Sequence, residues 1–208
     1  GVNRANYMEE NKANIDFEGK EAMYGEVYFL RAYYYFELVK FFGDVPLFTE
    51  ARLTAGQAGT LTRTPKDEVY AQIELDLQNA IASLPNSQSQ VGRVNKYTAY
   101  ALLGKVLLYQ DKFAEAASAL DNVIGVYSLV SDYGSQFLRF GENGPESVFE
   151  IQYSNQSNWY DWGCAHCSEG NYAIIMNGPR GWSGPEYAQG WSFNVPTEEF
   201  YNSFEEGD

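Results

Sequence analysis

Hydrophobic residues recur at spacings of three and four along residues 21–42, which is the pattern of a buried α-helix. One apolar face comprises Met23, Val27, Leu30, Tyr34, Leu38 and Phe41. A second face comprises Tyr28, Ala32, Tyr35, Val39 and Phe42. Because both faces are apolar, we expect this helix to be central, packed on two sides, and ended by Gly43. Its polar residues Arg31 and Glu37 are expected to pair with neighbours.

The same periodicity predicts three further helices. Residues 65–84 carry one buried stripe, with Thr64 as the predicted N-cap. Residues 95–125 predict a helical hairpin in which Asn95 caps the first helix and Asp111 caps the second. The hairpin fits the tetratricopeptide repeat pattern in part, through its Leu-Gly pair and its Ala-x3-Leu step.

The pattern changes after residue 130. Residues 147–153, SVFEIQY, alternate between apolar and polar and predict one short β-strand. Residues 154–192 are rich in Gly, Asn, Ser and aromatic residues, with little periodicity. We expect a long irregular segment there, of the kind that often carries function. Residues from 196 onward predict a last short helix.

These elements predict a mainly α fold. We expect tetratricopeptide-like helical hairpins over residues 1–130. Residues 131–208 are expected to form a loop-rich segment with a short strand and a final helix, within the same domain.

The charge balance argues against two classes of partner. The chain has 14 Lys and Arg against 28 Asp and Glu, a formal net charge of −14. A nucleic-acid-binding protein needs a basic surface to displace counterions from phosphates, and this chain has no dense Lys/Arg cluster. An anionic membrane surface is disfavoured for the same reason. No apolar run reaches the roughly 18 to 20 residues that span a bilayer.

Aromatic residues are unevenly distributed along the chain. All four Trp fall between Trp159 and Trp191. Flat rings match the apolar faces of sugars, while amide and guanidinium groups match their hydroxyl rims. The candidate ligand-binding residues are therefore Trp159, Tyr160, Trp162, Asn171, Tyr172, Arg180, Trp182 and Tyr187. The alternative is that these aromatic residues pack a loop-rich subdomain.

Cys164 and Cys167 enclose the single histidine of the chain, His166. A zinc site needs four ligands, and no second ligand pair accompanies this one. Haem attachment needs His directly after the second Cys, where Ser168 stands instead. The pattern favours a local disulfide between Cys164 and Cys167, with two inert thiols or metal and redox chemistry as the open alternatives. We expect no cofactor.

Six motifs resemble, in the same order, those of the SusD/RagB-type family, the surface glycan-capture lipoproteins of Bacteroidetes. They are NRAN (3–6), GEVYFLRAYYYFELVKFFGDVPLFTE (25–50), RTPKDEVYAQIELDLQNAIASLP (63–85), GRVNKYTAYALLGKVLLYQDKFAEAASALDNVI (92–124), ESVFEIQY (146–153) and GWSFNVPTEEFYNSFEEGD (190–208). The resemblance covers nearly the whole chain. Because Trp191 lies inside the last motif, we expect it to pack rather than to bind ligand.

The resemblance implies non-catalytic capture of oligosaccharides at the outer membrane, with a SusC-like TonB-dependent transporter as partner. It also implies that these 208 residues are a fragment, without the lipid anchor expected of the full-length protein. Two alternatives remain. One is a peptide-binding member of the same scaffold family. The other is an all-helical glycoside hydrolase with a carboxyl pair drawn from Asp161, Glu169 and Glu186.

Overall fold

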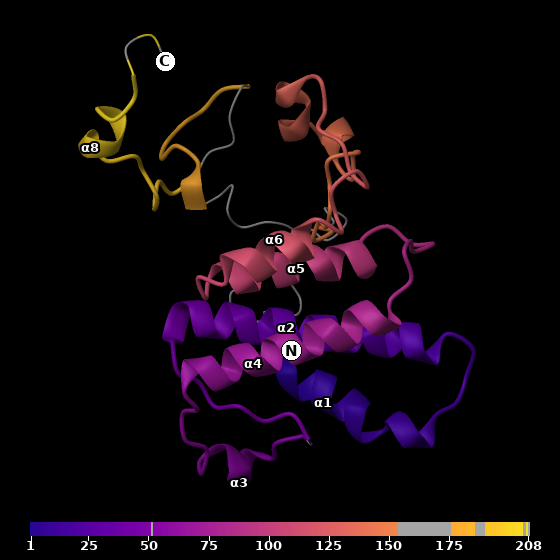
Figure 1. Cartoon of the computed structure of the whole chain (residues 1–208). Coiled ribbons are helices and arrows are strands. Elements are labelled where there is room, and N and C mark those ends of the chain that lie inside the picture. The colour runs from indigo at the N-terminus through magenta and orange to yellow at the C-terminus, as the bar shows by residue number, and fades with distance from the viewer. Residues whose placement is uncertain (51, 154–175, 186–189, 206, 208) are drawn as a thin grey trace. The chain divides into compact units, whose positions relative to one another are not determined.

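The computed structural model describes residues 1–50, 52–153, 176–185, 190–205 and 207 (Figure 1). The chain divides into two compact units, residues 1–150 and residues 151–208. The helices of unit 1 are α1 (Val2–Glu10), η1 (Lys12–Asn14), α2 (Lys20–Phe42), α3 (Ala55–Ala58), α4 (Lys66–Ser83), α5 (Lys96–Leu108), α6 (Phe113–Leu120), η2 (Tyr133–Phe137) and η3 (Arg139–Gly141). Unit 2 contains α8 (Glu198–Tyr201). The predicted mainly α fold is confirmed.

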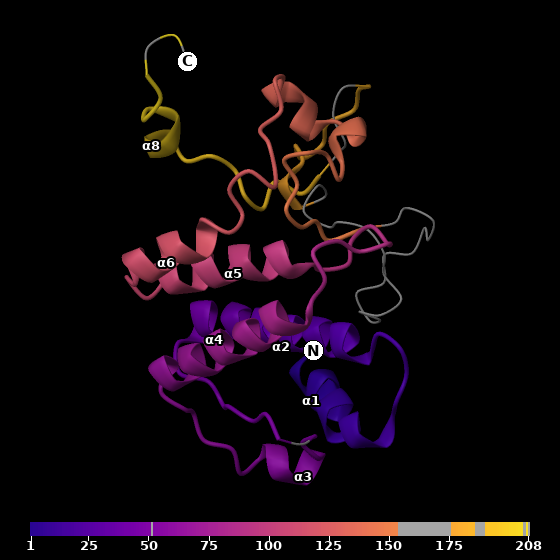
Figure 2. The ribbon, with the colours of Figure 1, turned by 45° about the vertical axis from the view of Figure 1, so that its right-hand side comes forward.

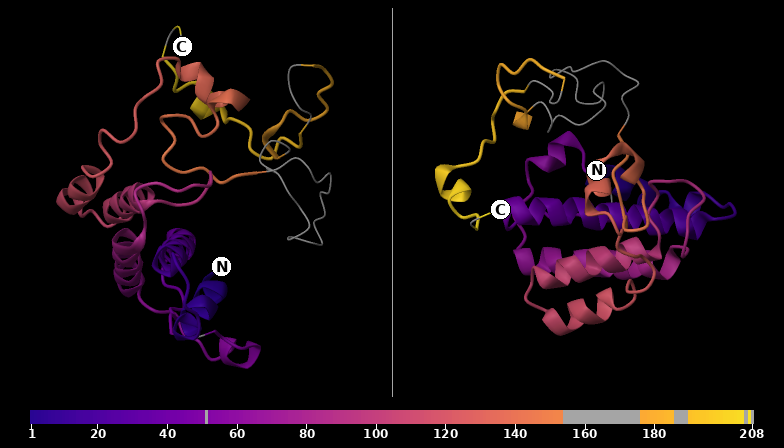
Figure 3. Two further views of the ribbon diagram at one scale, coloured as in Figure 1. Left: turned by 90° about the vertical axis from the view of Figure 1, so that its right-hand side faces the viewer. Right: turned by 90° about the horizontal axis from the view of Figure 1, so that it is seen from above.

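Unit 1 is a stack of antiparallel helices in which sequence neighbours lie side by side. Helix α2 packs on α1 and α4, α4 packs on α5, and α5 packs on α6. Figure 2 shows these as successive layers, and the left panel of Figure 3 shows the helices nearly end-on, following one another in that order. One hydrophobic core runs through the stack, with Phe36, Ile73, Leu77 and Val106 almost fully buried.

Helix α2 is central, as predicted, but its two apolar faces are only partly buried: Val27 of the first face is buried, and Phe42 of the second is 62% exposed. Ala32, Tyr35 and Val39 of the second face are at most 4% exposed. On the first face Leu30, Tyr34 and Leu38 are each more than a third exposed, and Phe41 is 77% exposed. The expectation that both faces pack is therefore wrong for these residues.

The sequence predicted the cap of one helix correctly and those of two others wrongly. Asn95 caps α5 as predicted, because its side chain accepts the backbone N–H of Thr98 at 3.0 Å in a capping box. The prediction for Thr64 is wrong: the carboxylate of Asp44 accepts the first N–H of α4 at 2.8 Å instead. The prediction for Asp111 is also wrong, because this residue adopts a left-handed turn conformation with φ of 59°.

The strand predicted for residues 147–153 is not formed. Among the described residues there are isolated β-bridges but no strand. A strand needs a neighbouring backbone for its ladder, whereas here the N–H of Ser147 donates within a turn to the carbonyl of Gly144, and side chains make the other contacts described next. The carbonyl of Val148 accepts from the hydroxyl of Thr98 at 3.1 Å, and the carboxylate of Glu150 accepts from the backbone of Asn143 at 2.9 Å.

A buried ion pair joins the two longest helices of unit 1. The guanidinium of Arg31 on α2 donates two hydrogen bonds to the carboxylate of Asp76 on α4, at 2.7 and 2.8 Å. Arg31 is 5% exposed and Asp76 is fully buried. Arg31 also donates to the side chain of Asn6 on α1 at 3.1 Å and to the carbonyl of Thr49 at 3.0 Å. The prediction that Arg31 pairs with a neighbour is confirmed, as is that for Glu37, which pairs with Lys40 at 2.6 Å.

Burial raises the pKa of the Asp76 carboxyl, and the two hydrogen bonds from Arg31 oppose that shift. A third donor, the amide of Gln72, reaches the same carboxylate at 3.1 Å. Each partner therefore compensates the desolvation of the other, and removing one would leave an uncompensated charge in the core.

Helices α5 and α6 approach closely at Gly104. A Cβ atom at this position would lie 2.6 Å from Cγ of Leu120, which is closer than carbon atoms can pack. This contact involves the Leu-Gly pair that the sequence matched to the tetratricopeptide pattern. It explains why a glycine suits a buried helical position that would otherwise favour alanine.

We expect Arg31→Met to lower the free energy of unfolding by about 3–5 kcal/mol, because it leaves the buried Asp76 carboxylate without its cationic partner. Urea denaturation of the protein measures this loss. Arg52→Met is the matched control, since Arg52 forms an exposed pair with Glu10 whose removal is expected to cost about 1 kcal/mol or less. Equal losses in the two variants would contradict the role given to the buried pair.

We also expect Gly104→Val to destabilise the protein by about 1–3 kcal/mol, because the new side chain forces α5 and α6 apart. Thermal unfolding measures the effect. Gly56→Val in α3 is the control, because a Cβ at Gly56 meets no atom within 4 Å. A neutral result for Gly104→Val would show that the two helices can separate without cost.

Candidate functional site

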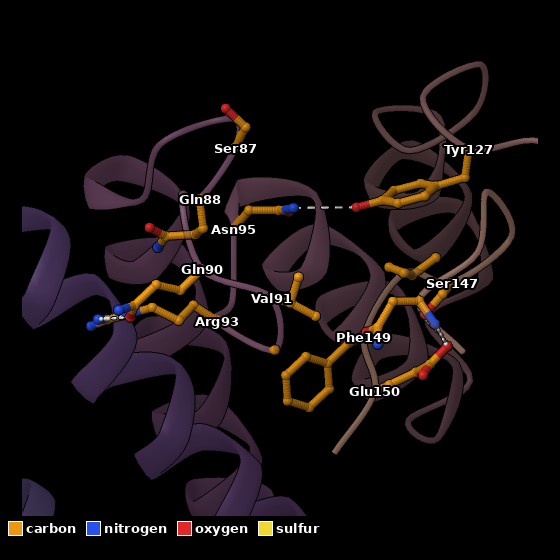
Figure 4. A pocket seen from close by; sticks show the side chains of 13 residues that line it. Ser87, Gln88, Gln90, Val91, Arg93, Asn95, Tyr127, Ser147, Phe149 and Glu150 are labelled. Atoms are coloured by element: carbon orange, nitrogen blue, oxygen red, sulfur yellow. Dashed lines mark hydrogen bonds between the residues drawn. The ribbon is translucent and has the colours of Figure 1, made fainter. Parts of the chain in front are cut away.

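A polar pocket opens on unit 1 where three segments meet (Figure 4). These segments are the 87–95 connection between α4 and α5, Tyr127 beyond α6, and residues 143–150. The pocket volume is ≈ 240 Å³. Its lining combines amide, hydroxyl and carboxylate groups with the rings of Tyr127 and Phe149.

Arg93 lines the pocket, and the carboxylate of Glu26 on α2 neutralises its positive charge. Its Nε donates to Oε1 of Glu26 on α2 at 3.0 Å, and its terminal nitrogen donates to Oε2 at 2.9 Å. This hydrogen-bonded carboxylate raises the pKa of Arg93. The other terminal nitrogen donates to the side-chain carbonyl of Gln90 at 3.0 Å. The guanidinium is therefore fixed in place and carries no uncompensated charge toward a ligand.

The amide of Gln88 belongs to the same network. Its NH₂ group donates to the carbonyl of Val94 at 2.8 Å and to the Glu26 carboxylate at 3.1 Å. Glu26 therefore holds two pocket residues from the neighbouring helix. The loop between α4 and α5 owes its conformation to this carboxylate.

The opposite wall is attached to the start of α5 and to the core. The side-chain NH₂ of Asn95 donates to the Tyr127 hydroxyl at 3.3 Å, while its carbonyl caps the helix. Thr98, only 3% exposed, ties the wall through its hydroxyl to the carbonyl of Val148. The ring of Phe149 packs edge-on against Phe29 of α2, with ring centroids 5.7 Å apart.

This arrangement suits binding rather than chemistry. Glu150 is the one carboxylate among the residues that line the pocket, whereas glycoside hydrolysis uses two. No group of three or more His, Cys, Asp or Glu residues that could hold a metal ion occurs among the residues searched, which are those that the structure describes. What the pocket offers is hydrogen-bond donors and acceptors beside apolar rings.

Most of the sequence-predicted site residues lie outside the described part of the chain. They are Trp159, Tyr160, Trp162, Asn171, Tyr172 and Tyr187, together with the disulfide candidates Cys164 and Cys167 and the acidic residues Asp161, Glu169 and Glu186. Their assignments stay predictions.

Two of the predicted residues, Arg180 and Trp182, are described and lie in unit 2. Nε and one terminal nitrogen of Arg180 donate to the carbonyl of Trp191 at 3.0 and 2.6 Å. The backbone N–H of Arg180 donates to the hydroxyl of Ser192 at 2.8 Å. Backbone hydrogen bonds between residues 176–179 and 190–193 run alongside these contacts. Arg180 thus holds the two segments together.

The rings of Trp182 and Trp191 are both partly accessible, at 38% and 37% exposed. Trp191 contacts the ring of Phe193, with centroids 5.4 Å apart. The sequence favoured packing for Trp191, and the structure places it beside Arg180 with more than a third of its surface exposed. It therefore joins Trp182 as a described candidate for ligand contact.

Sequence reasoning missed the pocket of unit 1. Its walls come from three segments that are separated in sequence, residues 87–95, Tyr127 and residues 143–150, so no local periodicity or spacing indicates them. The one available signal was the amide- and hydroxyl-rich run NSQSQ at residues 86–90, which lies one residue before the GRVN motif.

None of the described helices is both long enough and apolar enough to span a lipid bilayer.

Comparison with known proteins gives one consistent result. The SusD-like family model described as starch-binding and associating with the outer membrane matches residues 3–108. SusD-like protein P2 of Formosa agariphila is 32% identical over 206 residues, which is 96% of this chain and 38% of that protein.

Two solved structures extend the similarity beyond the matched residues. A laminarin-binding SusD-like protein superposes with a TM-score of 0.87 at 34% identity, over 97% of this chain and 47% of that one. Surface glycan-binding protein A of Bacteroides thetaiotaomicron, in complex with laminarihexaose, gives 0.83 at 26% identity, over 100% and 45%. The chain thus spans less than half the length of these relatives.

We expect Thr98→Val to destabilise the protein by about 1–3 kcal/mol, because the carbonyl of Val148 loses its hydroxyl donor and the backbone N–H of Asn95 loses Oγ1 of Thr98 as its acceptor. Amide hydrogen exchange at residues 143–150 should also become faster, since the tie to Val148 is lost. Thr60→Val is the control, because the Thr60 hydroxyl makes its bond on an exposed turn. Unchanged exchange at residues 143–150 would contradict the attachment of this wall to α5.

Proposed function

This chain belongs to the SusD-like family of starch-binding proteins that associate with the outer membrane, and we propose that it captures oligosaccharides at the cell surface. The captured glycan would pass to a TonB-dependent outer-membrane transporter of the SusC type. The full-length protein would be held at the membrane by a lipid anchor. Capture is non-catalytic in this proposal.

The similarity to glycan-binding structures carries the proposal. Two such structures, one of them in complex with laminarihexaose, match 97% and 100% of this chain with TM-scores above 0.8. Matches of this extent reach beyond unit 1, which ends at residue 150. Fold alone does not fix function, so the argument also needs a site with suitable chemistry.

The aromatic segment supplies that chemistry. Trp182 and Trp191 are both partly exposed, and Arg180 is fixed against the backbone of Trp191. Exposed indole rings bury the apolar face of a sugar, and polar groups at the rim then bind its hydroxyls. Trp159, Tyr160, Trp162, Asn171, Tyr172 and Tyr187 are proposed as further contacts on the basis of their sequence alone.

We expect the triple variant Trp159→Ala, Trp162→Ala and Trp182→Ala to lose most of its glycan affinity. Burying one large ring is worth about 1.5–3 kcal/mol, so each contacting tryptophan contributes about tenfold or more to the dissociation constant. Calorimetric titration against laminarihexaose, other plant, host and microbial glycans, and tryptic peptides measures the effect.

Phe41→Ala is the control in this titration, because Phe41 is an exposed aromatic residue on α2 of unit 1. Unchanged glycan binding in the triple variant would contradict the assignment of these tryptophans as glycan contacts. Binding to peptides alone would replace glycan capture by the peptide-binding alternative, and turnover of a bound glycan would contradict the non-catalytic role.

A further inference from the structure

We propose that the pocket of unit 1 is an additional binding site that takes one neutral sugar residue of a longer glycan. The described residues that line this site all belong to unit 1. The inference rests on the proposed function for the class of ligand, while the location rests on the geometry of the pocket.

Charge selects a neutral ligand. Phosphate, sulfate and carboxylate groups bind where arginine offers uncompensated, charge-assisted hydrogen bonds. Here the guanidinium of Arg93 is already satisfied by both oxygens of Glu26 and by Gln90. Glu150 adds a negative charge to the lining. Among the described residues that line the pocket, Arg93 is the one cation, and Glu26 already neutralises its charge.

Two amides of the lining are fixed by this network, and each keeps one hydrogen-bonding atom that the network does not use. Gln88 uses its NH₂ group on Glu26 and Val94, so its carbonyl oxygen is the atom left to accept. Gln90 uses its carbonyl oxygen on Arg93, so its NH₂ group is the atom left to donate. A sugar hydroxyl both donates and accepts, and adjacent hydroxyls can use such a pair.

Rings and volume complete the match. In Figure 4 the amides of Gln88 and Gln90 lie on one side of the pocket and the ring of Tyr127 lies on the other. Tyr127 and Phe149 provide apolar surface for the C–H face of a pyranose. Pockets for drug-sized ligands measure about 300–1,000 Å³. A volume of ≈ 240 Å³ therefore suits one sugar residue, with the rest of the glycan outside.

The test is an NMR titration of the isotope-labelled protein with laminarihexaose, following the side-chain amide signals of Gln88 and Gln90. We expect these signals to shift and saturate in the wild type and in Trp182→Ala. In Gln90→Leu and in Tyr127→Ala the apparent affinity read from the remaining pocket signals should fall about tenfold or more. Gln78→Leu, an exposed position on α4, is the matched control and should leave the shifts unchanged.

The outcomes separate this inference from the proposed function. Shifts of the tryptophan indole signals without any shift at Gln88 and Gln90 would leave glycan capture standing and overturn the pocket as a site. If no signal moved with any neutral glycan, both proposals would fail. Because Gln90→Leu replaces an exposed side chain, it tests the site even if Tyr127→Ala fails to fold.

Glu26→Gln tests the charge argument directly. The substitution keeps a hydrogen-bonding group beside Arg93 but removes the cancelling charge. We expect affinity for a uronic-acid oligosaccharide to rise about tenfold, because the Arg93 charge becomes available to the ligand. Affinity for laminarihexaose should stay within about twofold. A wild-type protein that already prefers the uronic-acid oligosaccharide would overturn the assignment to neutral sugars.

Discussion

The buried pair of Arg31 and Asp76 is the interaction on which the helical stack depends. A guanidinium and a carboxylate removed from water are tolerated only when nearly all of their hydrogen-bonding capacity is used. Arg31 meets that demand by reaching Asp76 on α4, Asn6 on α1 and the carbonyl of Thr49 in the loop after α2. Four segments are thereby tied to a single side chain. Any sliding of α4 along α2 would break the bidentate geometry, so this pair sets the register of the two longest helices.

That register also determines the pocket of unit 1. Glu26 lies on α2, five residues before Arg31, and it points at the connection that follows α4. The backbones approach closely there, since a Cβ at Gly25 would lie 2.9 Å from Cγ of Leu84. The connection therefore leaves α4 directly beside Glu26, and Arg93 returns to meet it. The core charge pair and the polar pocket are two consequences of the same packing of α2 on α4.

Much of unit 1 could be predicted from the sequence, because its signals are local. The apolar spacing of α2, α4 and α5 gave those helices, and Asn95 was identified as a cap because it stands directly before one of them. The failures involve partners distant in sequence. Asp44 displaced Thr64 as the group that starts α4, and Thr98 took the carbonyl that a strand at 147–153 would have used. The pocket could not be predicted for the same reason, because its lining segments are separated in sequence.

Both candidate sites for a glycan contain polar side chains that hydrogen bonds already hold in place, and this bears on affinity. Ordering side chains on binding costs about 0.5–1.5 kcal/mol for each flexible group. In unit 1 these side chains are already ordered before a ligand binds, since Glu26 fixes Gln88 and Arg93, and Arg93 fixes Gln90. In unit 2 Arg180 is likewise fixed, on the carbonyl of Trp191. Such preorganised polar groups make binding depend on how the hydroxyls of the sugar are placed. Aromatic rings by themselves bind any apolar face. A protein that captures glycans without cleaving them needs this combination, because its selectivity must come from binding alone.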